Sequence, residues 1–342
     1  SQGNASGQRR VQTPHQRREG VFFLYGKAQR GGKSSVRQDG DPPGKKFLVV
    51  VADDLGRSSG INQAIAEAHD RGIVTAASIM AGGEAFQEAV QIARDRHELA
   101  VGLHVTLCDG RAVLPPSSIP SLTDAEGYME KSPARAWIKY TRPALLSQIE
   151  REVEAQFDRL AMAGLHPVHV DCHHHLHMHP FIFEVICRQA ARRGVNWVRI
   201  PIESLPVVLG SRSRLRGMMP LVEWAVFGIV GMRNKRIAGK YGLRTACHVY
   251  GLSRTGGIDE EYLLDVLNHL EGRVNEFFTH PDSSTEAGRK EMRALTSAQV
   301  RERLASLGII KANYRELSEG TVILDSVWGR MCKRLSSFCF RH

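Results

Sequence analysis

Short apolar runs alternate along most of the chain with segments whose apolar residues recur at helical spacing. The first run, FLVVVA, lies within KKFLVVVADDLG at residues 45–56 and is typical of a strand buried on both faces. In NQAIAEAHDRGI, at residues 62–73, apolar residues stand three and four positions apart, and this spacing predicts a helix. We therefore expect strands and helices to alternate through the folded body.

The same patterns locate the remaining elements. Strands are predicted at residues 45–56, 75–81, 99–107, 166–173, 195–201, 246–252, 274–280 and 308–313. Helices are predicted at residues 62–73, 84–96, 143–164, 180–193, 259–270 and 296–308. Such alternation indicates a parallel sheet with helical crossovers, and seven or eight mostly parallel strands favour a closed (β/α) TIM-like barrel in a single α/β domain. An open doubly wound sheet is the alternative, although no Gly-rich phosphate-binding loop follows any strand.

The net charge of +10 belongs to the two ends of the chain. Residues 1–46 hold ten Lys/Arg against three Asp/Glu, and residues 326–342 hold four against none, which leaves 32 basic and 33 acidic residues between them. A nearly neutral body argues against a nucleic-acid partner, which needs clustered cations on a folded face. We expect a disordered basic extension over residues 1–45, a barrel over 46–325 and a basic tail over 326–342.

Cysteine usage and hydropathy suggest a cytoplasmic protein. The six cysteines show no CxxC spacing, which is typical of reduced thiols, and no apolar run is long enough to span a bilayer. An insertion between two predicted strands, at residues 205–244, contains LVEWAVFGIVGM flanked by Arg/Lys clusters. This segment is expected either to lie in the interface at the inner face of a membrane or to be a barrel helix that covers the sheet.

Chemically active side chains gather where the predicted strands end. Catalytic groups of parallel barrels lie at the carboxyl ends of the strands, so these side chains would share one rim. The residues concerned are Asp53, Asp54, His104, Asp171, His173, Arg199 and His280. Each alone has a simple structural explanation, such as helix capping for the two aspartates or core packing for a histidine, but their joint occurrence favours a functional site.

The stretch HVDCHHHLHMHP, at residues 169–180, contains six histidines. Alternate residues of a strand share a face, so His169, Asp171 and His173 are expected to point the same way. Together, Asp54, His104 and His173 form an open three-ligand set for one divalent ion, with a coordination position left for water. Two imidazoles and a carboxylate suit Zn²⁺, and Mg²⁺ or Mn²⁺ is the alternative for an oxygen-rich shell.

Three blocks of the sequence resemble a known family. VVVADDLG, VGLHVTL and HVDCHHHLHMHP are similar to the signature blocks of the YdjC-like carbohydrate deacetylases, which include chitooligosaccharide deacetylase, and the resemblance covers about residues 46–318. Two further stretches, DGRAVLPPSSIPSLTDAEG and VRIPIE, look closest to the hopanoid-biosynthesis-associated branch. The resemblance implies a distorted (β/α) barrel and an N-acetylated sugar or glycolipid substrate.

Roles for single residues follow from the resemblance. It implies that Asp54, His104 and His173 bind the metal and that Asp53 is the general base. His280 stands where an imidazole acid is expected, although THPD at residues 279–282 departs from the family's usual ending. Four residues are expected around the metal ligands or the substrate, namely His169, Asp171, His175 and Arg199. For Arg199, contact with the sugar or the oxyanion and a salt bridge to an acidic neighbour are equally open.

We therefore expect a metal-dependent hydrolase that removes the N-acetyl group from an N-acetylglucosamine-type sugar, lipid-linked as in an N-acetylglucosaminyl hopanoid. Deacetylation of free chitooligosaccharides is one alternative, and a metal-dependent phosphoesterase on a similar barrel is another. A metal- or sugar-binding protein without activity is a third, but Asp53 and His280 are both present. A peripheral membrane contact and a homodimer remain open.

Overall fold

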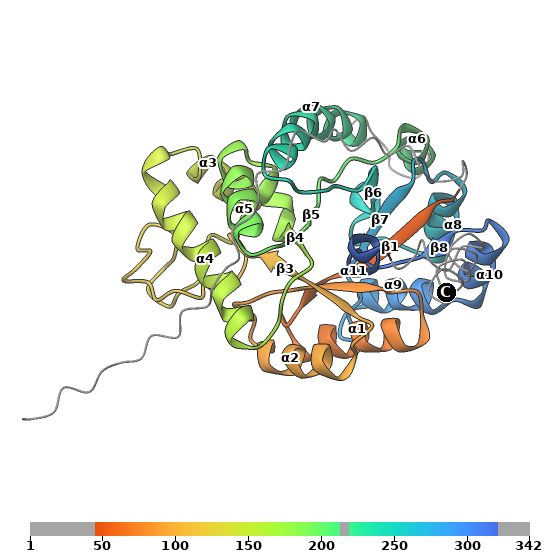
Figure 1. Cartoon of the computed structure of the whole chain (residues 1–342), viewed down its shortest axis with the longest axis horizontal. Helices are drawn as coiled ribbons and strands as arrows, with labels where there is room; N and C mark the ends of the chain where they lie inside the picture. Colours follow the sequence, from red (N-terminus) through yellow and green to blue (C-terminus); the bar gives the residue numbers. More distant parts are fainter. Residues whose placement is uncertain (1–44, 213–218, 321–342) are drawn as a thin grey trace, which may run out of the picture. The chain divides into compact units, whose positions relative to one another are not determined.

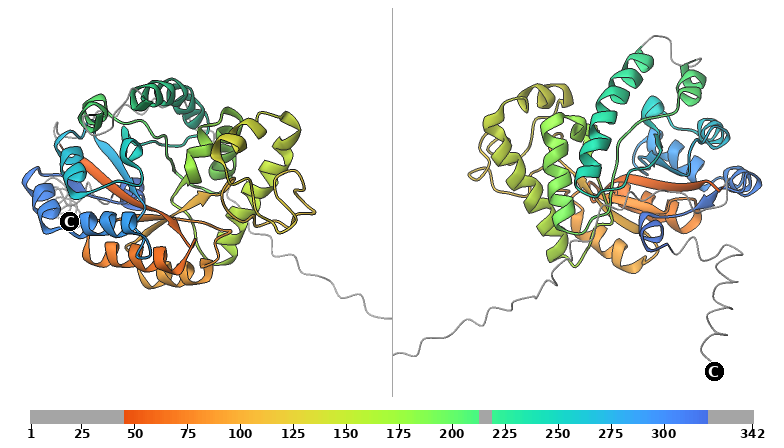
Figure 2. Two further views of the ribbon diagram at one scale, coloured as in Figure 1. Left: turned by 180° about the vertical axis from the view of Figure 1, so that it is seen from behind. Right: turned by 45° about the horizontal axis from the view of Figure 1, so that its top comes forward.

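The computed structural model describes residues 45–212 and 219–320, which Figures 1 and 2 show in colour. The strands are β1 (Phe47–Leu55), β2 (Ala76–Ile79), β3 (Ala100–Val105), β4 (His169–Cys172), β5 (Trp197–Val198), β6 (His248–Tyr250), β7 (Val274–Thr279) and β8 (Ile310–Lys311). The α-helices are α1 (Ser59–Arg71), α2 (Phe86–Asp95), α3 (Pro133–Lys139), α4 (Leu146–Met162), α5 (Pro180–Arg192), α6 (Leu205–Arg212), α7 (Met219–Lys240), α8 (Glu260–Asn268), α9 (Glu286–Thr296), α10 (Ala298–Ser306) and α11 (Tyr314–Glu319). Short 3₁₀ turns are η1 (Pro143–Leu145), η2 (His173–Met178) and η3 (Leu252–Arg254).

All strand pairs of the sheet are parallel. The order is β5-β4-β3-β2-β1-β7-β6, and β8 pairs with the start of β1. The two ends of this order come together, since the Val198 amide donates to the Arg244 carbonyl at 3.0 Å and the Val249 amide donates to the Ile202 carbonyl at 3.0 Å. Figure 1 shows the helices around the curled sheet. The prediction of a distorted, TIM-like (β/α) barrel is confirmed, and each predicted strand contains an observed one.

Strand β1 occupies the centre of the sheet. It pairs with β2, β7 and β8, and all nine of its residues are buried. The apolar run of β1 therefore packs on both faces, as its sequence predicts. Because β1 is central, the two aspartates near its carboxyl end lie between the neighbouring strand ends that carry the other candidate residues.

The helices differ from prediction mainly where the chain leaves the simple alternation. Helices α3, α9 and α11 were not predicted, and a break at Ser297 separates α9 from α10 because the Ser297 side chain caps α10. The insertion at residues 205–244 contains α6 and α7, and α7 packs against α5. None of the helices in the described part of the chain is both long enough and apolar enough to cross a bilayer. The expected extension up to residue 44 and the tail over 326–342 lie outside the described residues.

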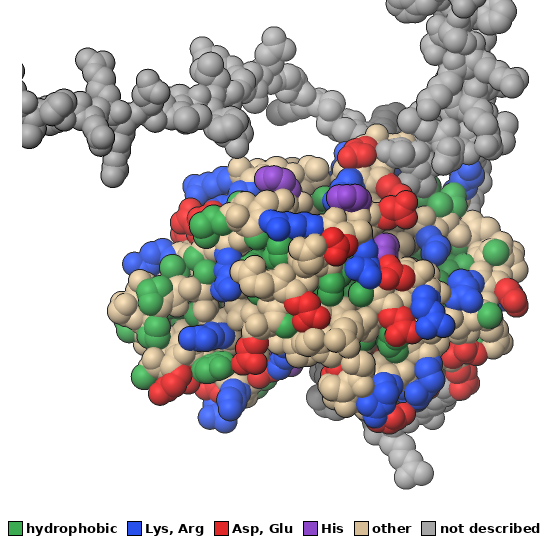
Figure 3. All heavy atoms as spheres, turned by 90° about the horizontal axis from the view of Figure 1, so that it is seen from below, with side chains coloured by type: hydrophobic (Ala, Val, Ile, Leu, Met, Phe, Trp, Pro, Cys, Tyr) green, Lys and Arg blue, Asp and Glu red, His purple; other side chains and the backbone are tan. Residues whose placement is uncertain are grey.

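Charge on the barrel surface is mixed. On the face that Figure 3 shows, basic and acidic side chains are interspersed, and no large area of one sign appears. This agrees with the nearly neutral composition of residues 47–325 and favours no polyanion on that face.

Gly102 in β3 tests how tightly the barrel interior is packed. A Cβ atom at this position would lie 2.3 Å from Nε2 of His169, so an alanine must displace the buried ring. We expect Gly102→Ala to lower the free energy of unfolding by about 1–3 kcal/mol in urea titrations. Gly228→Ala is the control, because its Cβ would meet open space on α7 and should raise stability by up to about 1 kcal/mol. Equal stability of Gly102→Ala and wild type would contradict this packing.

Candidate metal centre and active site

Three residues expected as metal ligands come together at the carboxyl ends of the strands. Asp54 lies at the end of β1, His104 near the end of β3 and His173 directly after β4. Nε2 of His104 is 3.2 Å from Oδ1 of Asp54, and Nδ1 of His173 is 2.9 Å from the same oxygen. The three side chains are buried, and their potential ligand atoms lie within 4.8 Å of one another. This spacing allows them to share one ion.

Two polar atoms of this cluster lack partners outside it. Oδ1 of Asp54 and Nε2 of His104 are buried and contact no hydrogen-bonding group beyond the three side chains. The other ring nitrogen of His104 lies 2.7 Å from Oδ1 of Asp171, so its N–H donates to that carboxylate and Nε2 faces Asp54. A buried carboxylate oxygen and a buried imidazole nitrogen without further partners are costly, and a divalent ion, which would take the place of a proton on Nε2, would satisfy both. The residues therefore fit a metal ion.

His173 fits less directly. Its Nε2 accepts a hydrogen bond from Nη1 of Arg57 at 2.7 Å, whereas an imidazole that binds a metal through Nδ1 carries a proton on Nε2. Arg57 must then leave Nε2, and Oδ2 of Asp109, 3.6 Å away, is the nearest acceptor for that proton. Arg57 and Asp109 already form an ion pair at 2.8 Å. Metal binding through Nδ1 of His173 would thus require Arg57 to move away from His173.

Two further trios overlap with the first, and each already contains an arginine partner. Asp53, His104 and Asp171 form one trio, but Arg199 binds both of its carboxylates. Asp109, His173 and His174 form the other, in which Arg57 binds Asp109 and His173. Asp54 Oδ1 and His104 Nε2 are the atoms left without a partner, so one ion per chain is the arrangement that the charges favour.

The backbone around the centre is strained. Among the described residues, the non-glycine residues with positive φ are Asp54 (66°), Asp109 (46°), His174 (53°) and His175 (51°). All four line one cavity. Side chains other than glycine adopt this conformation at a cost of about 1–3 kcal/mol each. A register shift between β1 and β2 lies between Ala52 and Leu55, the segment that contains the two aspartates. Such clustering is typical of functional sites.

A fully buried arginine lies beneath the centre. Arg199 is 2% exposed, and its guanidinium binds Asp53 through both terminal nitrogens at 2.5 and 2.8 Å. It also contacts Asp171 at 2.8 Å and pairs with Glu276. Of the two alternatives left open for Arg199, the structure shows the salt bridge. The arginine holds the carboxylates in place from below.

The electrostatics of the centre favour a positive charge. Burial alone would lower the pKa of His104, but the carboxylates of Asp171 and Asp53 raise this pKa to about 10. Burial likewise would raise the pKa of Asp54, yet the imidazoles of His173 and His104 hold it well below its usual value. Burial raises the pKa of Glu276 to about 7 despite the charge of Arg199. The buried cluster therefore contains more carboxylates than arginines, and its charge favours a bound cation.

A cavity of about 600 Å³ opens onto the cluster. The expected base Asp53 and acid His280 both line it, and Nε2 of His280 is 3.9 Å from Oδ2 of Asp53. This distance is too long for a hydrogen bond, and both side chains line the cavity. Ile61, Phe227 and Leu252 form an apolar part of the wall. The cavity wall therefore has a polar part, formed by the acids and imidazoles, and an apolar part.

The remaining candidates lie around this arrangement. His169 is 1% exposed, and its Nε2 lies 3.0 Å from Oγ of Ser78, which donates to Asp171 at 2.6 Å. His175 lines the cavity, and its ring contacts Phe278. Sequence reasoning missed Ser78 and Glu276, although a glutamate inside the apolar strand VNEFFT is itself a signal. It also missed Arg57 and Asp109, which stand in loops.

A comparison with known proteins gives the context. The model of the YdjC-like protein family matches residues 47–306. A carbohydrate deacetylase from Brevibacillus brevis is 37% identical over 167 residues, which are 49% of this chain and 62% of that protein. A chitooligosaccharide deacetylase from Citrobacter koseri is 39% identical over 174 residues, which are 49% of this chain and 66% of that protein. The chain thus matches less than two thirds of either relative's length.

A solved structure is similar over a larger part of the chain. It is a protein from Enterococcus faecalis V583 to which a role in cellobiose-phosphate cleavage is provisionally assigned. The two chains are 25% identical and superpose with a TM-score of 0.65 over 80% of this chain and 99% of the other.

His177 tests the burial of neutral imidazoles next to the site. Its Nε2 lies 2.9 Å from the Arg199 carbonyl, and burial lowers the pKa of His177 to about 4. A lowered pKa stabilises the fold fully above the unfolded value of about 6.5, and this contribution is lost as the pH falls from 6.5 toward 4. In His177→Gln the amide keeps the donor, so urea unfolding should show an acid loss smaller by about 2–3 kcal/mol. The exposed His97→Gln serves as control, and identical pH profiles for all three proteins would contradict the assignment.

Proposed function

The chain belongs to the YdjC-like protein family, and from this premise we propose that it is a metal-dependent hydrolase that removes the N-acetyl group from an N-acetylglucosamine-type sugar. One observation carries the proposal, namely the meeting of Asp54, His104 and His173 at a point beside the Asp53 and His280 side chains. The names of the two curated relatives, a carbohydrate deacetylase and a chitooligosaccharide deacetylase, support the same chemistry.

One divalent ion, Zn²⁺ or Mg²⁺, would be held by Asp54, His104 and His173. When bound, such an ion polarises an acyl oxygen and lowers the pKa of water. The nitrogen-rich set favours Zn²⁺ over Mg²⁺, which prefers oxygen ligands. Asp171 positions the centre, because it fixes the His104 ring through Nδ1 at 2.7 Å.

The chain's own residues move the protons. The Asp53 carboxylate takes a proton from the attacking water as the new C–O bond forms. Nε2 of His280 then gives a proton to the nitrogen as the C–N bond breaks, so that acetate and a free amine leave. Arg199 keeps the Asp53 carboxylate oriented, since both of its oxygens accept from the guanidinium. Asp53 and His280 lie 3.9 Å apart and both line the cavity, which supports their action on the same scissile bond.

The substrate that we propose is lipid-linked, an N-acetylglucosaminyl hopanoid as the resemblance suggests. The apolar wall formed by Phe227 and Leu252 supports an apolar aglycone. On its outer side, helix α7 exposes Val226 (52%), Ile229 (67%) and Met232 (60%) at helical spacing. Free chitooligosaccharides are the alternative substrate.

The outer side of α7 also suits an anionic lipid surface. Residues 224–240 contain no Asp or Glu, and their basic side chains are exposed at Arg233, Lys235, Arg236 and Lys240. An apolar stripe with adjacent cations binds interfacially through buried apolar area and electrostatic attraction. We include this peripheral contact in the proposal.

Metal content and activity separate the proposed roles. His104→Gln should lose the bound metal, measured by elemental analysis after dialysis, together with acetate release from N-acetylglucosaminyl substrates. Asp53→Asn should keep the metal and lose activity by about 10²–10⁴-fold, because only the proton acceptor is removed. The exposed His166→Gln controls for the loss of any histidine. Stoichiometric metal in His104→Gln, or wild-type activity in Asp53→Asn, would overturn the respective assignment.

Vesicle co-sedimentation tests the lipid contact. The full chain should sediment with vesicles that contain phosphatidylglycerol, and the double substitution Ile229→Glu with Met232→Glu should reduce the bound fraction by roughly tenfold through lost apolar burial. Met162→Glu on α4 is the control, because Met162 is 81% exposed away from α7. Equal sedimentation with and without vesicles would rule out the contact and leave the hydrolase proposal unaffected.

A further inference from the structure

The first residue of α11 packs against the amino-terminal ends of the strands. Tyr314 is 2% exposed and lies in an apolar cluster with Ala76 and Ala100, which begin β2 and β3. The rings of Tyr314 and Trp197, which begins β5, have their centroids 4.9 Å apart. The catalytic cavity lies at the opposite, carboxyl-terminal ends of the strands. Tyr314 therefore enters the barrel interior from the end that is remote from the site.

Local structure fixes the position of this tyrosine. Asn313 caps α11, and its own amide donates to the Glu316 carboxylate at 2.8 Å, so the helix begins at a defined residue. Oγ of Ser318 accepts a hydrogen bond from Nε1 of Trp197 at 2.9 Å and donates to the Tyr314 carbonyl at 2.8 Å. These contacts attach α11 to β5. The Tyr314 hydroxyl consequently has little freedom to move.

The Tyr314 hydroxyl begins a chain of hydrogen bonds that ends at the proposed base. It donates to Oε2 of Glu276, and Oε1 of the same carboxylate accepts from Nε of Arg199. Arg199 in turn donates to Asp53 from both of its terminal nitrogens. None of the four side chains is more than 2% exposed. The chain of contacts thus runs through the buried interior from α11 to the catalytic cavity.

The protonation of the two inner groups follows from their surroundings. Burial and the charge of Glu276 hold the pKa of Tyr314 well above its usual value, so the hydroxyl keeps its proton and donates. Burial raises the pKa of Glu276 to about 7, whereas Arg199 and the Tyr314 hydroxyl oppose this rise. Asp171 and Asp53 are the other charged groups that face Glu276, and they raise its pKa further. Loss of the Tyr314 hydroxyl should therefore favour a protonated Glu276.

Stability alone does not account for this arrangement. Glu276 stands in the strand VNEFFT, paired on both sides by β1 and β6, where an apolar side chain would be buried without cost. Buried ion pairs can often be replaced by apolar residues without loss of stability. The network instead supplies geometry, because Glu276 occupies Nε of Arg199 and leaves the two terminal nitrogens facing Asp53. Without an acceptor at Nε, the guanidinium is free to rotate away from the base.

We propose that Tyr314 and Glu276 are positioning residues for the general base and act on Asp53 through Arg199. The inference rests on the proposed deacetylase function and assigns to it two residues that do not touch the substrate. Tyr314 lies beyond residue 306, where the match to the family model ends. Helix α11 therefore contributes to a reaction centre at the other end of the strands.

Acetate release by the full chain, with kcat and KM determined separately, tests the positioning role. Tyr314→Phe keeps the ring and should lower kcat about three- to tenfold at unchanged KM, because one hydrogen bond to Glu276 is lost. Glu276→Gln should lower kcat about 10–100-fold. The double variant should be no slower than Glu276→Gln, since the hydroxyl acts only through the carboxylate. Losses that multiply in the double variant, or a changed KM at unchanged kcat, would overturn the proposal.

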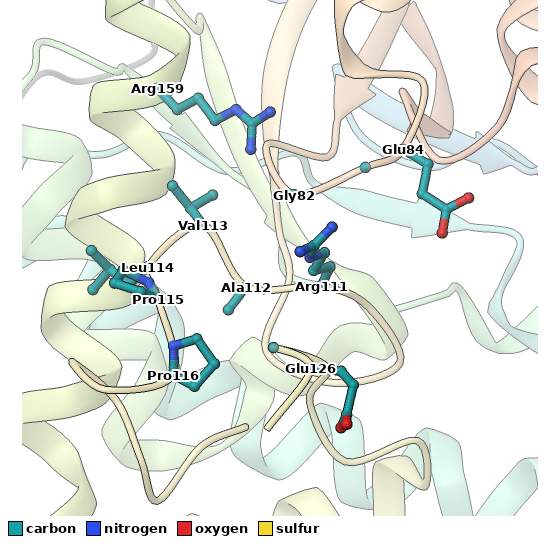
Figure 4. Close-up of a pocket in the computed structure, with 12 residues that line it drawn as sticks. Gly82, Glu84, Arg111, Ala112, Val113, Leu114, Pro115, Pro116, Glu126 and Arg159 are labelled. Carbon is teal, nitrogen blue, oxygen red and sulfur yellow. The ribbon is translucent and has the colours of Figure 1, made fainter. Parts of the chain in front are cut away.

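A second tyrosine–glutamate pair provides the matched control. Glu84 lines a hollow of about 500 Å³ that shares no lining residue with the catalytic cavity, and Figure 4 shows this hollow. Its carboxylate accepts a hydrogen bond from the Tyr128 hydroxyl at 3.4 Å. Tyr128→Phe and Glu84→Gln should therefore keep the wild-type kcat, and thermal melting verifies that every variant is folded. A loss of kcat in Tyr128→Phe as large as that in Tyr314→Phe would contradict a specific role of Tyr314.

Infrared spectroscopy tests the same link without turnover. The carboxylic-acid band of Glu276 is obtained as the difference between a protein and its Glu276→Gln counterpart. In wild type this band should reach half its height near pH 7, and in Tyr314→Phe about one pH unit higher, because the hydroxyl stabilises the anion. Equal midpoints would overturn the proposal. Midpoints that differ as expected, without acetate release by wild type, would instead count against the proposed reaction and retain the link between Tyr314 and Glu276.

Discussion

The charge balance around Arg199 is the constraint on which the site depends. One guanidinium, 2% exposed, faces the carboxylates of Asp53, Asp171 and Glu276. Burying charges without partners costs several kcal/mol each, and a single arginine cannot neutralise three ionised carboxylates. The excess is relieved in two ways, because burial raises the pKa of Glu276 to about 7 and Asp171 shares its charge with His104. The remaining negative charge is that of the Asp54 carboxylate, where the ion is proposed to bind.

The same charge balance accounts for the two arginines that flank this cluster of acids. Arg199 pairs with the buried carboxylates, and Arg57 contacts Asp109 and His173. Between them, Asp54 and His104 keep a buried oxygen and a buried nitrogen without partners. A site that only stabilised the fold would not combine such unpaired atoms with four strained backbone positions. The fold tolerates these costs because the central, fully buried β1 and its neighbours hold the strand ends rigidly.

The sequence allows the fold and the centre of the site to be predicted for one reason. In a parallel barrel the strand ends share a rim, so the position of Asp54, His104 and His173 at three strand ends is enough to bring them together. Arg57 and Asp109 could not be found this way, because they stand in loops. The path of the loop after β3 depends on contacts such as those of Glu152 with the amides of Val113 and Leu114. Arg199 is an intermediate case, since its strand was predicted but its partner Glu276 lies 77 residues further on.

We therefore expect the loops around the cavity to determine which substrate this site accepts. The centre is built from strand ends, and the arrangement of its acids and imidazoles follows from the barrel. The wall with Arg57 and Asp109 comes from loops after β1 and β3, whereas the wall with Phe227 comes from the inserted helix α7. Arg57 contacts both His173 and Asp109, so this one guanidinium joins the loops after β1 and β3 to a residue that is proposed to hold the ion. An ion that binds through Nδ1 of His173 would therefore also change the contacts of these loops.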